Sequence, residues 1–184
     1  MKFAFCLFKY FEYGGLQRDF LRIATECTSR GHDVHAFVSE WQGAEPRGIT
    51  VTVLKTWGWI FNHAQNKHFH HQLQHELRRT PFDCVVGFDR MPNLDIYYGA
   101  DFCYIGRAVP GYGPWYRIGP RYRHFHTFEK AVFGRDSKTL ILSLSEREKS
   151  VYQQHYFTEE GRFHQLPPTL DSDRMPVPNR AMER

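Results

Sequence analysis

The sequence predicts one α/β domain of Rossmann type, a mostly parallel sheet with helices on both faces. Short apolar runs typical of buried strands alternate along the chain with segments whose apolar residues recur at helical spacing. The chain has 184 residues, of which 41% are hydrophobic and 24% charged, which suffices for one sizeable core and leaves little room for a second. We place this domain at residues 1–168 and interpret residues 169–184 as a linker or disordered tail, because few apolar residues remain there.

The chain opens with a predicted strand, a glycine pair and a helix. Residues 3–8 form the apolar run of a buried strand, and Leu16 and Phe20 begin an apolar stripe at helical spacing. Arg30 and Gly31 predict the end of that helix.

The remaining elements follow from the same two periodicities. Further strands are expected at residues 34–38, 49–54, 83–88, 98–105 and 139–144. Helices are expected at residues 64–79, 120–133 and 146–155, with Ser145 capping the last. Residues 163–166 close the ordered part.

Between the first strand and helix, Gly14 and Gly15 form a loop that suits a phosphate group. Glycine tolerates a tight turn, and a helix N-terminus presents unpaired N–H groups. Lys9 and Arg18 flank the pair and strengthen this interpretation. The pattern is not GxGxxG, which disfavours a plain dinucleotide-binding fingerprint, and an ordinary turn remains the alternative.

Composition excludes several classes of protein. A formal net charge of +4 is too modest for a general nucleic-acid binder. The four cysteines include no CxxC pair and are interpreted as reduced thiols of a cytosolic protein. We expect no signal peptide and no membrane-spanning segment.

Residues 104–126 combine arginine with aromatic side chains and contain no acidic residue. Such a surface suits an anionic membrane or a phosphorylated head group. An ordinary loop and an RNA-binding surface are the alternatives. The residues that we assign to acceptor or membrane binding are Lys9, Arg18, Arg107, Trp115, Tyr116, Arg117, Arg121 and Arg123.

Asp101 is the candidate catalytic residue, because a carboxylate in an apolar strand-end context needs a reason to be there. It could accept a hydrogen bond from a substrate hydroxyl or stabilise positive charge at a reacting carbon; a turn contact is the alternative. In a parallel sheet, the Gly14–Gly15 loop, residues 89–92 and Asp101 all follow carboxyl ends of strands, so one shared cleft is expected. Asp19 and Glu129 could equally be charged residues on the protein surface.

Histidines recur in the segment 63–75, and His71 and His75 lie four residues apart. Zinc could use such a pair, but no acidic residue or cysteine except Glu76 is near, so a solvated helix face is favoured. We therefore predict no metal site.

Several short motifs resemble the lipopolysaccharide core glucosyltransferase I family, within glycosyltransferase family 4. They span nearly the whole chain, from about residue 3 to 170, and lie at residues 9–11, 13–20, 30–32, 62–63, 91–92, 94–95, 100–101, 103–104, 121–124, 128–129, 155–156, 162–163 and 166–168.

The resemblance implies the N-terminal, acceptor-binding lobe of a two-lobed GT-B enzyme. That enzyme would transfer glucose from UDP-glucose to a heptose of the lipopolysaccharide inner core, with retention and without a metal ion or cofactor. It would attach to the cytoplasmic face of the bacterial inner membrane through residues 104–126. Gly14, Gly15 and Asp19 would lie by the donor, and Asp101 by the reacting centre.

Two departures from the family qualify this prediction. Asp89 and Arg90 stand where the family has Asn-Lys, and the chain stops where a second lobe would begin. We therefore expect little transfer without a C-terminal donor lobe, which a separate gene could encode. A truncated, non-catalytic membrane- or phosphate-binding module is the alternative, and no nucleic-acid partner is expected.

Overall fold

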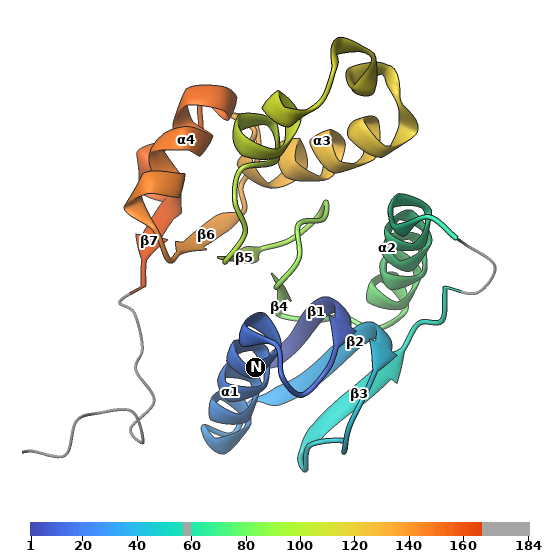
Figure 1. Cartoon of the computed structure of the whole chain (residues 1–184). Coiled ribbons are helices and arrows are strands. Elements are labelled where there is room, and N and C mark those ends of the chain that lie inside the picture. Colours follow the sequence, from blue (N-terminus) through green and yellow to red (C-terminus); the bar gives the residue numbers. More distant parts are fainter. Residues whose placement is uncertain (57–59, 167–184) are drawn as a thin grey trace, which may run out of the picture.

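The computed structural model describes residues 1–56 and 60–166, which form a twisted parallel sheet flanked by helices (Figure 1). Its strand order is β3-β2-β1-β4-β5-β6-β7, and every neighbouring pair is parallel. The predicted fold class, a single Rossmann-like α/β domain, is confirmed. The strands are β1 (Lys2–Tyr10), β2 (Asp33–Trp41), β3 (Ile49–Val53), β4 (Cys84–Gly87), β5 (Ile96–Gly99), β6 (Leu140–Ser143) and β7 (Phe163–Gln165).

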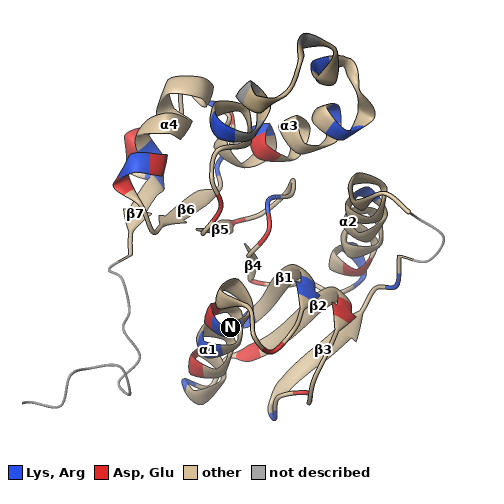
Figure 2. Cartoon of the chain, in the orientation of Figure 1, with Lys and Arg blue, Asp and Glu red and all other residues tan. Residues whose placement is uncertain are grey.

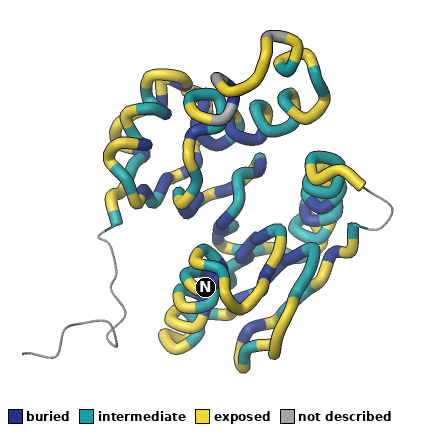
Figure 3. The backbone as a smooth tube through the Cα atoms, in the orientation of Figure 1, coloured by how far each residue is buried: buried dark blue, intermediate teal, exposed yellow. Residues whose placement is uncertain are grey.

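Helices cover both faces of the sheet and enclose two apolar cores (Figure 3). The helix α1 (Gly15–Ser29) packs on one face through Phe20 and Ala24. The helices α2 (Asn62–Arg79), α3 (Pro120–Phe133) and α4 (Glu146–Tyr156) contribute to the core on the other face.

Two helix boundaries confirm predictions from local sequence. Gly31 adopts a left-handed φ of 82°, and the N–H of His32 donates to the carbonyl of Cys27 at 3.1 Å, which is the hydrogen bond of a glycine-terminated helix. At the start of α4, Ser145 accepts a hydrogen bond from the N–H of Glu148 at 3.4 Å. Glycine and serine at these positions therefore fix where α1 ends and α4 begins.

The predicted strand at 98–105 is wrong from residue 100 onward, and the observed strand begins two residues earlier, at Ile96. The strand β5 ends at Gly99, and the chain then turns into a short π-helical segment, Tyr104–Ala108. The N–H of Cys103 donates to Glu148 at 3.0 Å, and that of Tyr104 donates to Glu129 at 2.7 Å. These N–H groups bond to carboxylates of α3 and α4, so they cannot extend the strand.

The structure also bears on the predictions about cysteines and about membrane-spanning segments. All four cysteines are free thiols, and among the described residues no helix is both long and apolar enough to span a bilayer. The predicted tail, residues 169–184, lies outside the described residues.

Candidate functional site

The candidate site lies at the carboxyl edge of the sheet, where the strand order reverses. The strand β1 pairs with β2 on one side and with β4 on the other, and loops that follow such neighbouring strands form the usual ligand crevice of a doubly wound sheet. Residues of both charge signs occur in the part of the chain that follows β4 and β5 (Figure 2).

Asp89 lies two residues after the end of β4 and connects this strand to β1. Its carboxylate accepts a hydrogen bond from the N–H of Phe8 at 2.6 Å. Burial and the negative charge of Asp101 raise the pKa of Asp89 to about 7, although the Phe8 N–H and Arg90 oppose this shift. Asp89 therefore exchanges a proton near neutral pH.

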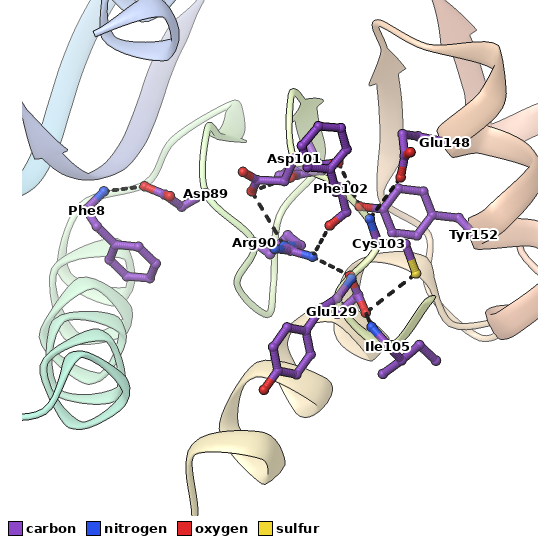
Figure 4. Close-up of polar contacts among 12 residues, drawn as sticks. Phe8, Asp89, Arg90, Asp101, Phe102, Cys103, Ile105, Glu129, Glu148 and Tyr152 are labelled. Atoms are coloured by element: carbon purple, nitrogen blue, oxygen red, sulfur yellow. Dashed lines mark hydrogen bonds and ion pairs between the residues drawn. The ribbon is translucent and has the colours of Figure 1, made fainter. Parts of the chain in front are cut away.

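Arg90 lies between the carboxylates of Asp101 and Glu129 (Figure 4). Its Nε is 3.5 Å from Asp101, and its Nη1 donates to the carbonyl of Phe102 at 3.2 Å and to the Glu129 carboxylate. One guanidinium thus orders the loop after β5 and ties it to α3.

Asp101 remains accessible although its neighbours hold it. The hydroxyl of Tyr97 donates to its carboxylate at 3.1 Å, and the hydroxyl of Tyr152 donates to its backbone carbonyl at 3.0 Å. The side chain is 38% exposed and borders a cavity of about 410 Å³ shared with Arg90, Phe102 and other residues of this loop. A positioned and exposed carboxylate can accept a hydroxyl hydrogen bond or stabilise a developing positive charge.

Glu129 is a site residue that the sequence interpretation missed. It is fully buried and accepts hydrogen bonds from Arg90, from the N–H groups of Tyr104 and Ile105, and from the hydroxyl of Tyr156 at 2.6 Å. The alternative of a surface charge is therefore wrong. The available signal was its position on the apolar face of its helix, beside Phe128 and Val132.

The glycine loop lies at the same edge, but its conformation differs from the one expected. Neither glycine has a positive φ; a side chain on Gly14 would instead overlap the amide of Gln17 and the ring of Phe11. The residue at the N-cap of α1 is Gly14, which has no side chain that could bond to the N–H groups of the first turn.

Asp19 connects α1 to β5 across this edge. The hydroxyl of Tyr98 donates to its carboxylate at 2.8 Å, and Arg22 bonds to its other oxygen at 3.3 Å. Lys9 is farther along the edge and pairs with Glu40 at 3.3 Å, and Arg18 is exposed on α1.

The basic and aromatic residues of 104–126 do not share one environment. Arg107 pairs with Glu148 and lies over the ring of Phe102. The hydroxyl of Tyr116 bonds to that of Tyr104 at 2.6 Å. Trp115 is 80% exposed, and Arg117, Arg121 and Arg123 are exposed as well.

The histidine run is only partly a solvated face. His63, His68 and His70 are half-buried, and His70 packs its ring edge-on against Phe128 of α3 at 5.4 Å. Among residues 1–56 and 60–166, no group of three or more potential ligand side chains is arranged to hold a metal ion.

Comparison with known proteins relates this geometry to an enzyme. No protein-family model matches the chain. It is 40% identical over 171 residues to the lipopolysaccharide glucosyltransferase WaaG of Escherichia coli (strain K12), an alignment that covers 93% of this chain and 46% of that protein. A crystal structure of WaaG, described as a glycosyltransferase involved in lipopolysaccharide biosynthesis, matches with a TM-score of 0.91 and 39% identity. This chain is similar to about half of WaaG.

The match confirms the resemblance and the fold that it implied. The structural alignment covers 96% of this chain and 48% of the WaaG chain, so the chain spans about half the length of the relatives it matches. The chain is 40% identical to WaaG in the matched part, and its structure superposes well on that part. The domain that contains Asp89, Arg90 and Asp101 therefore has the fold of one lobe of a GT-B protein.

Proposed function

We propose that the chain is the acceptor-binding lobe of a retaining glucosyltransferase of lipopolysaccharide synthesis. The observation that carries the proposal is the similarity to about half of WaaG over 93% of this chain. The full reaction would move glucose from UDP-glucose to a heptose of the inner core. A second lobe, within the same polypeptide or supplied separately, would hold most of the donor.

Within this proposal each group at the carboxyl edge has a role. Asp101 lies by the reacting centre, where its accessible carboxylate meets a substrate hydroxyl or developing charge. The α1 N-terminus behind Gly14 and Gly15 faces the donor phosphates, and Asp19 lies near the donor. We expect neither metal nor cofactor to be needed, since positive charge for the phosphates comes from side chains and helix dipoles.

The test is reconstitution of transfer from radiolabelled UDP-glucose to a lipopolysaccharide that ends at the inner-core heptose. The chain would be assayed alone and with the part of E. coli WaaG that it does not match, with whole WaaG as the positive control. We expect transfer only in the mixture, unaffected by a chelator of divalent cations. Turnover by the chain alone at the rate of WaaG would contradict the need for a second lobe.

A matched pair of variants tests the role of Asp101 in that mixture. Asp101→Asn removes the charge at the cavity, and transfer should fall by roughly 10²–10³-fold, as when an electrostatic group of an active site is lost. Asp136→Asn makes the same chemical change at an exposed position beyond α3 and should leave transfer unchanged. Equal activity of the two variants would exclude Asp101 from the reaction.

We also propose that the chain acts at the cytoplasmic face of the inner membrane, as a peripheral protein. The support is the exposed indole of Trp115, followed closely in sequence by exposed Arg117 and Arg121, a combination suited to an anionic bilayer surface. In sedimentation with anionic vesicles, Arg117→Glu/Arg121→Glu should reduce binding, whereas Arg47→Glu/Arg78→Glu should have little effect. If the chain binds vesicles but the reconstituted mixture transfers no glucose, the second candidate function, a non-catalytic membrane-binding module, is favoured.

A further inference from the structure

A second, larger cavity of about 750 Å³ lies between α2 and α3. The helices are neighbours in Figure 1, and the ring of His63 on α2 is 6.3 Å from that of His124 on α3. His63, Lys67 and His71 recur every four residues and therefore line the cavity from one face of α2. None of the residues that line the cavity beside Asp101 also lines this one.

The lining of this cavity is cationic and lacks any acidic residue. Lys67 faces it from α2 and Arg123 from α3. Within the described part of the chain, neither side chain forms an ion pair with a carboxylate. Burial, followed by repulsion from His63 and Lys67, lowers the pKa of His124 to about 4. Two basic side chains in a lining without an acidic residue make an environment that an anion would complete.

The same cavity also presents apolar surface. Ile118, just before α3, is 61% exposed at this site, and Phe128 closes the cavity from within α3. The volume falls in the range of about 300–1,000 Å³ typical of small-molecule sites. A ligand that fits both halves of the lining carries an anionic group and an apolar group.

We propose that the cavity between α2 and α3 binds the phosphate group of an anionic amphiphile. Lys67 and Arg123 pair with the phosphate oxygens, and Ile118 and Phe128 contact the attached apolar group. Arginine and lysine are the side chains best suited to phosphate. The site does not depend on glucosyl transfer, so its test uses neither donor nor acceptor.

The experiment is calorimetric titration of the full chain with hexyl phosphate and with monomeric dihexanoyl phosphatidic acid. The Lys67→Gln/Arg123→Gln variant should lose at least tenfold in affinity. The control, Arg47→Gln/Arg78→Gln, removes two exposed charges away from the cavity and should bind like the wild type. Absence of binding by the wild type, or equal affinity of the two variants, would overturn the proposal.

A measurement on the wild type keeps the test valid if the double variant does not fold. A phosphate beside His124 favours its protonated form, so NMR titration with either ligand should raise the pKa of this imidazole from about 4. An unchanged value at saturation would overturn the proposal.

Comparison of probes identifies the source of the phosphate. Binding of phosphatidic acid that hexyl phosphate does not reproduce assigns the site to a lipid headgroup. Equal affinity for hexyl phosphate and phosphatidic acid shows that the site also accepts soluble phosphorylated molecules. Binding of either probe that does not depend on Lys67 and Arg123 would contradict the site.

Discussion

At the scale of single residues, the carboxylates on either side of Arg90 have opposite characters. Glu129 is fully buried and its oxygens are occupied by hydrogen-bond donors. Asp101 is held by Tyr97 but keeps 38% of its side chain exposed. A carboxylate with no exposure cannot contact a ligand, so Glu129 is a positioning residue, while Asp101 is free to contact one.

Glu129→Gln should therefore destabilise the fold. The change leaves the half-buried Arg90 facing a neutral amide and turns an NH₂ group toward donors. Loss of one partner of a buried pair costs about 3–5 kcal/mol. Urea unfolding at pH 7 measures this, with Glu45→Gln in an exposed loop as the control, expected within about 0.5 kcal/mol of wild type. Coincident curves for both variants would contradict the role of Glu129.

The raised pKa of Asp89 predicts a pH dependence of stability with a definite sign. Its value of about 7 exceeds the ordinary 3.8, so the folded state binds this proton more tightly than the unfolded state. The resulting stabilisation is complete below about pH 4 and is lost as the pH rises through 7. From pH 5 to 8, wild-type stability should fall relative to Asp89→Asn by on the order of 2 kcal/mol. Urea unfolding of both proteins at four pH values measures this difference in the free energy of unfolding. If the free energies of the wild type and of Asp89→Asn change in parallel with pH, the prediction is wrong.

At the scale of elements, the start of α1 depends on the absence of a side chain at one glycine. An added Cβ on Gly14 would lie 1.8 Å from the Gln17 side chain, which is buried and donates to the carbonyl of Lys9. On Gly15 it would meet nothing within 4 Å. Gly14→Ala should therefore cost about 1–2 kcal/mol through the displaced Gln17 amide, whereas Gly15→Ala should be neutral or stabilising. Thermal unfolding compares the two, and equal melting temperatures would argue against this packing.

The order of elements could be predicted from sequence because each boundary carries its own local signal. Helix α3 begins and ends at the predicted residues, and its first residue is Pro120, a residue suited to a first turn. The error after Gly99 had a different origin. The N–H groups of Cys103 and Tyr104 bond to Glu148 and Glu129, which lie more than twenty residues away in sequence. A local pattern contains no information about such partners.

The same distinction applies to the candidate site. Strand ends correctly placed Asp89 and Asp101 at one edge, because the carboxyl ends of parallel strands meet there. The bridge formed by Arg90 required knowledge of where α3 packs. The histidines of α2 were likewise interpreted without their neighbour, although His70 contacts Phe128.

At the scale of the whole molecule, the parallel sheet gives the domain two unlike edges. The loops after β1, β4 and β5 all emerge at the carboxyl edge, whereas the turns before β2, β4 and β6 lie at the opposite edge. Large apolar side chains are exposed at the carboxyl edge, with Tyr13 95%, Phe61 66% and Phe102 65% accessible. Exposed apolar groups beside a ligand cavity are typical of a surface that meets a partner.

This asymmetry predicts where a second lobe docks. On addition of the unmatched part of E. coli WaaG, amide hydrogen exchange should slow in residues 11–15, 89–93 and 100–107 of this chain. Exchange in the opposite turns, residues 30–32, 80–83 and 134–139, should stay unchanged, because a lobe that closes over the Asp101 cavity cannot reach them. Mass spectrometry of peptides from the chain with and without the added lobe measures both sets in one experiment. Protection at the opposite turns, or equal protection at both edges, would show that the lobes do not meet across the candidate site.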